Sequence, residues 1–281
     1  MRVKDKILIS AVIPCYNDGA YIEDAVNSVK LQTHSPIEII VVDDGSSIST
    51  KNVLANLESK IDLLIVQENL GPSKARNKGI AKAKGEFILV LDSDDYFEPT
   101  FCDKAIQVFR EKREVKIISS HTKLHFTDGS FQLYKPKGGD LKKFLFGNHS
   151  TGSCLIRKSS WLEVGGYDET MRTGFEDWEF YIRILAQGGR AFTINEVLLN
   201  YRKRNDSTTK KANSERYNLW KYIFTKHSNI YCENFEDFLE FFLFKLKREE
   251  EEKIKNRNRL EFRLGEMLLK PLKQIKKLYL R

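Results

Sequence analysis

Residues 87–95 read FILVLDSDD, an apolar run that ends in three carboxylates within four residues. A continuous apolar run of this length is typical of a buried strand in a parallel sheet. Asp92 and Asp94 then follow the carboxyl end of that strand, where open α/β sheets bind their ligands. Neighbouring carboxylates repel one another unless a cation joins them. The stretch therefore predicts Mg²⁺ or Mn²⁺ at Asp92 and Asp94, shared with the phosphates of a substrate. The alternative is a solvated acidic turn before a helix, with Asp95 or Glu98 near the start of that helix and Asp95 as its cap.

The preceding residues alternate between two periodicities. Apolar runs typical of strands lie at residues 7–13, 38–42, 61–67 and 87–91, and segments with helical apolar spacing lie between them at residues 21–32, 50–57 and 73–83. The order β-α-β-α-β-α-β predicts a parallel sheet with right-handed crossovers. Pro14 is expected to end the first strand. The predicted fold class is α/β, with a mostly parallel, Rossmann-like sheet flanked by helices.

The second half continues this pattern and then changes character. A strand at 115–119, a hairpin at 123–134, a helix ending at Ala186 and a strand at 191–199 follow in order. From residue 205 helical spacing dominates. The sequence thus predicts a catalytic domain over residues 1–204 and a helical, basic extension over 205–281.

Charge and cysteine content limit the class of protein. The chain has 47 Lys and Arg against 39 Asp and Glu, a formal net charge of +8, which favours anionic partners. Nucleic-acid binding is not predicted, because the basic residues are spread among acids. The four cysteines form no CxxC pair, which fits a reducing, cytoplasmic setting. No apolar stretch resembles a signal peptide or a membrane span.

The end of the extension is the one candidate for membrane contact. Residues 268–281 have helically spaced apolar positions, and all their charged side chains are basic. Such a stripe can touch anionic lipid headgroups at the inner face of a membrane. The alternatives are an oligomer interface and packing on the catalytic domain.

Several other nucleotide-binding and signalling classes fit poorly. A dinucleotide-binding turn would read G-x-G-x-x-G, whereas residues 14–19 read PCYNDG, and no P-loop motif occurs. A flavodoxin-like, Mg²⁺-binding signalling domain leaves the second half unexplained. A sugar nucleotidyltransferase would need a Gly-rich, basic first loop. An inactive binding module would have no need of the intact carboxylates.

Six short motifs occur in one order along residues 7–204. They are Pro14-x-Tyr16-Asn17, Asp43-Asp44-Gly45-Ser46, Asn69-x-Gly71 with Ala75-Arg76-Asn77-x-Gly79, Asp92-Ser93-Asp94-Asp95, Gly165-Gly166-Tyr167-Asp168 and Glu176-Asp177-Trp178. Together they resemble the family-2 inverting glycosyltransferases with the GT-A fold, of the kind that builds bacterial surface glycans. The resemblance implies metal-dependent transfer of a sugar, with inversion, from a nucleotide-diphosphate sugar to a hydroxyl of a growing glycan or glycolipid. It also implies Mn²⁺ or Mg²⁺ and a UDP-sugar donor.

The resemblance assigns nucleotide contacts to four positions. Tyr16 would stack on the base, with Pro14 shaping the turn. Asp44 would accept a hydrogen bond from the base, as a carboxylate can from an N–H group. Arg76 would contact the donor nucleotide. The plainer alternatives are a loop aromatic for Tyr16 and a solvated helix charge for Arg76.

The chemistry is assigned to three carboxylates. Asp92 resembles the residue at the ribose and metal edge, and Asp94 the direct metal ligand. The acceptor hydroxyl is a poor nucleophile until a base removes its proton, and a carboxylate near a helix start suits that task. Asp177 is that candidate, and the resemblance implies the same role; local capping is the alternative. Glu176 would support the acceptor site, and Trp178 either walls a sugar ring or packs in the core.

One position departs from the family. Many relatives end the last strand in Tyr-Arg-x-His, whereas this chain reads Tyr201-Arg202-Lys203-Arg204. Arginine cannot ligate a cation but can grip a diphosphate. We therefore expect the metal to be held by Asp94, phosphates and water, and to bind weakly without a donor.

Overall fold

The protein is described from a computed structural model that covers residues 7–204, 208–265 and 267–269. It divides into two compact units, Met1–His227 and Ser228–Arg281. The first unit includes α8 (Thr208–Ser214) and α9 (Arg216–Lys226), which follow the change of composition at residue 205. The assignment of catalysis to residues 1–204 alone therefore stays a prediction.

The N-terminal half of the first unit is a βα repeat. Its elements are β1 (Ile9–Cys15), α1 (Ile22–Lys30), β2 (Ile37–Asp44), α2 (Ile48–Leu57), the 3₁₀ turn η1 (Glu58–Lys60), β3 (Leu63–Gln67), α3 (Pro72–Lys82) and β4 (Phe87–Val90). The four strands are parallel and lie in the order β3-β2-β1-β4. All four carboxyl ends therefore lie at one edge of the sheet, as the sequence predicts.

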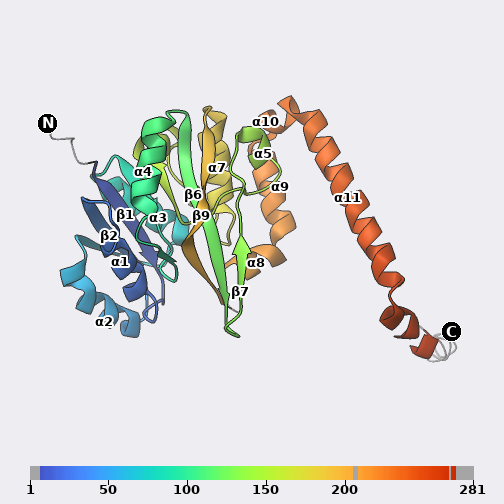
Figure 1. Cartoon of the computed structure of the whole chain (residues 1–281), viewed down its shortest axis with the longest axis horizontal. Coiled ribbons are helices and arrows are strands. Elements are labelled where there is room, and N and C mark those ends of the chain that lie inside the picture. The colour runs from blue at the N-terminus through green and yellow to red at the C-terminus, as the bar shows by residue number, and fades with distance from the viewer. Residues whose placement is uncertain (1–6, 205–207, 266, 270–281) are drawn as a thin grey trace. The chain divides into compact units, whose positions relative to one another are not determined.

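The second half of the unit extends this sheet. Its elements are β5 (Tyr96–Phe97), α4 (Phe101–Glu111), β6 (Val115–Phe126), β7 (Phe131–Tyr134), α5 (Leu141–Phe144), β8 (Cys154–Arg157), α6 (Lys158–Val164), α7 (Glu176–Ala186) and β9 (Arg190–Lys203). The full order is β3-β2-β1-β4-β8-β6-β9-β5, with β7 paired to β6. Strand β8 is antiparallel to β4 and β6, whereas the long strands β6 and β9 run parallel, side by side (Figure 1).

Two local predictions are wrong. Pro14 does not end the first strand, because it stays in parallel register with Val42 and β1 runs on to Cys15. Asp95 does not cap a helix, because α4 starts only at Phe101. The buried Asp95 carboxylate instead accepts the backbone N–H of Arg202 at 3.0 Å. This contact fixes the end of β9 to the acidic turn.

Helices cover both faces of the sheet and bury its alternating side chains. One face of β1, with Ile9, Ala11 and Ile13, joins a core that α1, α2 and α4 complete. On the opposite face α3 lies so close to β1 that a Cβ on Gly79 would stand 2.5 Å from Cγ1 of Val12. Only glycine fits at this crossing, which brings α3, and Arg76 on it, against the sheet.

The close approach of α3 gives a prediction about stability. We expect Gly79→Ala to destabilise the fold by about 1–3 kcal/mol, because the added methyl overpacks the α3–β1 contact. Gly147→Ala is the matched control, since a Cβ there meets nothing within 4 Å. Urea unfolding of the two variants measures the difference. Equal midpoints would show that α3 can move away from the sheet at little cost.

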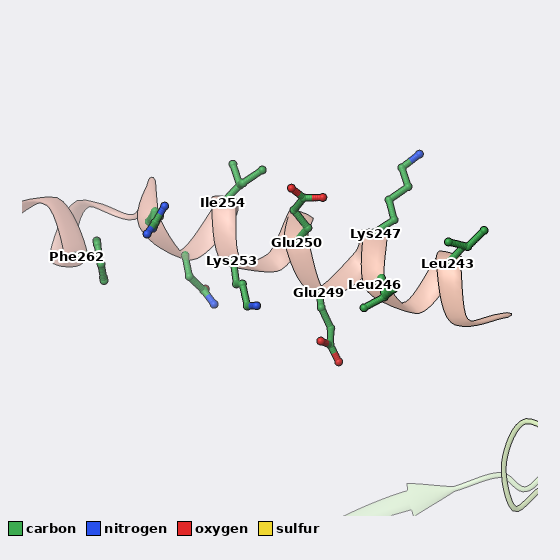
Figure 2. A pocket seen from close by; sticks show the side chains of 10 residues that line it. Leu243, Leu246, Lys247, Glu249, Glu250, Lys253, Ile254 and Phe262 are labelled. Atoms are coloured by element: carbon green, nitrogen blue, oxygen red, sulfur yellow. The ribbon is translucent and has the colours of Figure 1, made fainter. Parts of the chain in front are cut away.

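The second unit contains α10 (Ser228–Glu233), α11 (Phe235–Arg257) and further helical residues at 260–265 and 267–269. The hollows found along α11 are lined by side chains such as Leu243, Leu246 and Ile254, which Figure 2 shows pointing away from the helix in several directions. None of the predicted site residues lines them. Within the described ranges, no helix is long and apolar enough to cross a bilayer. Residues 270–281 of the predicted basic stripe lie outside those ranges.

Candidate active site

The loops that follow β1, β2 and β4 are bonded to one another. The backbone N–H of Asn17 donates to Oγ of Ser46 at 3.0 Å, which joins the first two loops. Ser93 Oγ donates to Oδ2 of Asp18 at 2.6 Å, which joins the first loop to the DSDD turn. Asp18, Asp92 and Asp94, called here the acidic cluster, thereby lie at one edge of the sheet.

Asp44 lies at the end of β2 and is almost fully buried. Its Oδ1 accepts from the Gln67 amide at 2.7 Å and from the N–H of Leu70 at 2.8 Å, and its Oδ2 accepts from the N–H of Gly71 at 2.9 Å. In this conformation the carboxylate orders the loop that leads into α3. A hydrogen bond from Asp44 to a base stays a prediction, and it would use the remaining acceptor capacity of the carboxylate.

Arg76 connects the acidic cluster to α7. The buried guanidinium donates through Nη2 to Asp92 Oδ1 at 2.7 Å and through Nη1 to Glu176 Oε1 at 2.6 Å. Its carbon lies 5.5 Å from the ring centre of Tyr167. A contact between Arg76 and the donor remains a prediction. In the structure this arginine ties the DSDD turn to the start of the helix that carries Asp177.

Asp177 lies in the first turn of α7 with both oxygens engaged. Oδ1 accepts the N–H of Trp178 at 2.8 Å, and Oδ2 accepts the side-chain amide of Asn148 at 2.7 Å. A Cβ built on Gly152 would lie 3.6 Å from Oδ2 of Asp177 and 3.6 Å from Oδ2 of Asp92. The two carboxylate oxygens are therefore separated by no more than twice that distance.

The surroundings of these carboxylates raise two pKa values. Burial, followed by the charge of Glu176, raises the pKa of Asp177 from 3.8 to about 7, against the opposing effect of Arg76. Burial and the charges of Asp92 and Asp18 raise the pKa of Asp94 to about 6, against the opposing effect of Arg204. A carboxylate with a pKa near the working pH is well suited to accept a proton.

Arg204 and Arg202 bring the end of β9 into the same site. Arg204 Nη1 donates to Asp18 Oδ1 at 2.5 Å, and its Nε lies 3.4 Å from Asp94 Oδ2. Arg202 Nη1 donates to the carbonyl oxygen of Asp94 at 2.7 Å. Asp94 therefore has one guanidinium on its backbone and another on its side chain.

Four of the seven predicted site residues lie in one region: Arg76 contacts Asp92 directly, Asp92 and Asp177 both lie beside Gly152, and Asp94 follows Asp92 in the same turn. Tyr16, at the end of β1, has 49% of its surface exposed, whereas Pro14 is buried within the strand. Trp178 is buried, with its indole N–H on the Phe144 carbonyl oxygen at 2.5 Å, so it packs in the core. It does not wall a sugar site in this conformation.

Sequence reasoning missed two contacts that define the site. Asp18 follows the carboxyl end of β1, in one of the segments that carry the family resemblance. Because β1 is a neighbour of β4 in the sheet, this position could have suggested that Asp18 lies near Asp92 and Asp94. Asn148 lies in an irregular segment with no periodic signal, and only the tertiary structure brings it to Asp177. Glu176 was expected near the acceptor, and the structure adds its ion pair with Arg76.

Comparison with known proteins defines the class to which this site belongs. The sequence model for Glycosyl transferase family 2 matches residues 10–163. Curated relatives include an uncharacterized glycosyltransferase of Haemophilus influenzae, 27% identical over 74% of this chain and 74% of the relative. Another is the putative teichuronic acid biosynthesis glycosyltransferase TuaG of Bacillus subtilis, 28% identical over 77% of this chain and 84% of the relative.

Solved structures share the fold. S. aureus TarS 1–349 in complex with UDP-GlcNAc has a TM-score of 0.61 and 22% identity, and the match covers 73% of this chain and 61% of that one. The likeness confirms the predicted GT-A-type α/β fold. The match to the sequence model, together with this fold, defines the protein as a glycosyltransferase in class. The chain belongs to glycosyl transferase family 2 and is a glycosyltransferase of the EC 2.4 type.

Proposed function

We propose that the chain transfers a sugar from a UDP-sugar to a hydroxyl group of a growing surface glycan or glycolipid, with inversion at the anomeric carbon. The observation that carries this proposal is the short separation of Asp177 from Asp92 across Gly152. Asp177, the proposed proton acceptor, and Asp92 of the acidic cluster thus lie on either side of one glycine, which supports a shared substrate site. TarS in complex with UDP-GlcNAc and TuaG of teichuronic acid biosynthesis support the donor and acceptor classes by analogy.

A divalent cation fits the residues of this edge. Carboxylate oxygens are the donors that Mg²⁺ and Mn²⁺ prefer, and such ions typically use one or two carboxylates together with substrate phosphates. Among the described residues no three His, Cys, Asp or Glu side chains are arranged as a complete metal site. Asp94, with Asp92 beside it, would hold the ion. When bound, it would offset the charge that develops on the leaving diphosphate.

Asp177 would act on the acceptor. The hydroxyl attacks the anomeric carbon from the face opposite the leaving nucleotide, and a carboxylate on that face takes its proton. The Trp178 N–H and the Asn148 amide fix both oxygens of Asp177, so its orientation is set before substrates bind. The ion pairs of Arg76 with Glu176 and Asp92 link the helix that carries Asp177 to the DSDD turn. They would hold the proposed base at a fixed distance from the proposed donor site.

Calorimetric titrations and a screen for turnover test the proposal. UDP, GDP and dTDP are titrated into the protein with and without Mn²⁺, and a panel of nucleotide sugars is then screened for release of the nucleoside diphosphate. We expect UDP to bind with Mn²⁺ and one UDP-sugar to be turned over. Failure of every nucleotide to bind would rule the proposal out. Membrane attachment through residues 268–281 stays a separate prediction, which sedimentation with anionic vesicles would test.

The Asn148–Asp177 hydrogen bond gives a prediction about pH dependence. The amide stabilises the ionised carboxylate, so Asn148→Ala is expected to raise the pKa of Asp177 further above about 7. The acid limb of kcat/KM should then move to higher pH by about one unit, as expected for loss of a hydrogen bond to a charge. Asn218→Ala, which removes an exposed amide bonded to Glu215, is the control. An acid limb at the same pH in Asn148→Ala would show that Asn148 does not influence the group whose ionisation limits kcat/KM.

A further inference from the structure

The guanidinium of Arg204 lies between two carboxylates of the acidic cluster. Its Nη1 donates to Asp18 Oδ1 at 2.5 Å, and its Nε faces Asp94 Oδ2 at 3.4 Å. The second oxygen of Asp18 accepts from Ser93, so Asp18 is held to the same turn that carries Asp94. Arg204 directly follows β9, whose backbone is fixed by the bond between Arg202 and Asp95. A short, well-anchored segment therefore delivers this positive charge.

The negative charges of the acidic cluster explain why the guanidinium of Arg204 is held there. Asp18, Asp92 and Asp94 carry three negative charges, and the Arg204 guanidinium contacts two of these carboxylates, Asp18 and Asp94. Arg76 already neutralises Asp92 from the other side. Arg204 supplies a second positive charge, so the negative charge of the acidic cluster is partly neutralised before any ligand binds.

A divalent ion and the guanidinium compete for the same carboxylate. Asp94 would hold the ion through its carboxylate oxygens. Oδ2 of Asp94 already lies 3.4 Å from Arg204 Nε, and a cation bound to this carboxylate would be repelled strongly by the guanidinium in a partly buried site. Arginine has no lone pair to offer the ion, so it cannot join the coordination shell. The free protein is thus a poor site for the metal.

A diphosphate removes this conflict. Guanidinium groups bind phosphate oxygens in a bidentate fork, and the flexible side chain allows Arg204 to turn from Asp94 toward an incoming phosphate. We propose that Arg204 is a tethered counter-ion that excludes the divalent cation from the free enzyme and releases Asp94 when the diphosphate of the donor takes its charge. The inference rests on the proposed function, in which this edge binds a nucleoside-diphosphate sugar.

This arrangement couples two binding events. If the diphosphate draws Arg204 away from Asp94, UDP raises the affinity for Mn²⁺, and Mn²⁺ raises the affinity for UDP by the same factor. Without Arg204 the ion meets the carboxylates directly. Arg204→Gln is therefore expected to bind Mn²⁺ in the absence of UDP at least about tenfold more tightly than the unmodified protein, because one repelling charge is gone. The coupling factor should shrink accordingly.

The experiment follows free Mn²⁺ by electron paramagnetic resonance, with and without UDP. The matched control is Lys203→Gln, which removes one positive charge at the position next to Arg204. The ammonium group of Lys203 lies 5.3 Å from the ring centre of Tyr201. We expect weak Mn²⁺ binding by the unmodified protein and by Lys203→Gln unless UDP is present, and tight binding by Arg204→Gln in both conditions. UDP titrated in EDTA adds a second readout, in which Arg204→Gln should bind UDP more weakly than the control.

The possible results separate the inference from the function on which it rests. Equal Mn²⁺ affinity of the unmodified protein and Arg204→Gln in the absence of UDP would overturn the role of Arg204 while leaving the transferase proposal intact. Equal increases in Mn²⁺ affinity in Arg204→Gln and Lys203→Gln would show that the effect comes from overall surface charge, and would also overturn the role of Arg204. If UDP bound to none of the three proteins, with or without Mn²⁺, the proposed function itself would fail.

Discussion

Asp177→Asn is expected to lower the rate of sugar transfer by about 10²–10⁴-fold, the usual contribution of a positioned general base. An asparagine keeps the size of the side chain and can still accept the N–H of Trp178 through its oxygen. It cannot take a proton from the acceptor hydroxyl. Binding of the donor should change little, because the described contacts of Asp177 are with Trp178 and Asn148. The expected pattern is a large loss of kcat with an unchanged affinity for UDP.

The pH profile gives an independent check of the same residue. The pKa of Asp177 is raised from 3.8 to about 7, so the carboxylate is protonated and inactive as a base below that pH. We expect kcat/KM to fall about tenfold per pH unit below pH 7 and to level off above it. The residual rate of Asp177→Asn should lose this acid limb. Persistence of the limb in the variant would assign it to another group.

A matched control separates chemistry from helix stability. Asp103 is an exposed carboxylate in the first turn of α4, as Asp177 is in the first turn of α7. Both therefore interact with the positive end of a helix dipole. Asp103→Asn removes the same charge without touching the acidic cluster, and turnover should remain near that of the unmodified protein. Unimpaired turnover in Asp177→Asn would exclude this residue as the base.

The sequence predicted the βα repeat well because local and global signals agree there. Each apolar run, such as 87–91, is followed by turn residues and a segment with helical spacing, and parallel strands then place their carboxyl ends together. Asp92 and Asp94 could be located in this way. Pro14 was assigned wrongly because its missing N–H suggests a strand end, whereas the pairing of β1 with β2 continues past it.

The contacts of the site were far less predictable than its members. Arg76 can be recognised on α3, but nothing in its neighbours along the chain shows that it would join Asp92 to Glu176, which lies 100 positions away. Asn148 reaches Asp177 from a segment without periodic pattern. Such contacts depend on how the second half of the sheet packs against the first. Sequence periodicity reports burial and direction within an element and does not report this packing.

Asp94→Asn is expected to abolish the effect of Mn²⁺ on UDP binding. The asparagine retains the shape of the side chain but loses the charge that would hold the ion. The remaining carboxylates of the acidic cluster, Asp92 and Asp18, are each already paired with an arginine. Coupling between two ligands of one protein is typically worth a factor of about 5–150 in affinity, and this factor should fall to about one. Calorimetry with UDP, in Mn²⁺ and then in EDTA, measures it directly.

The affinity in EDTA distinguishes this variant from a damaged site. Asp94→Asn removes the negative charge that lies 3.4 Å from Arg204 Nε, while the contact of Nη1 with Asp18 remains, so the guanidinium is held less strongly and turns more readily toward phosphate. We therefore expect UDP to bind Asp94→Asn in EDTA at least as tightly as it binds the unmodified protein, whereas Arg204→Gln should bind it more weakly. The two substitutions act on one ion pair and should change metal-free UDP affinity in opposite directions. A loss in both would indicate that either change disrupts the acidic turn, and would remove the basis for Asp94 as the ligand of the cation.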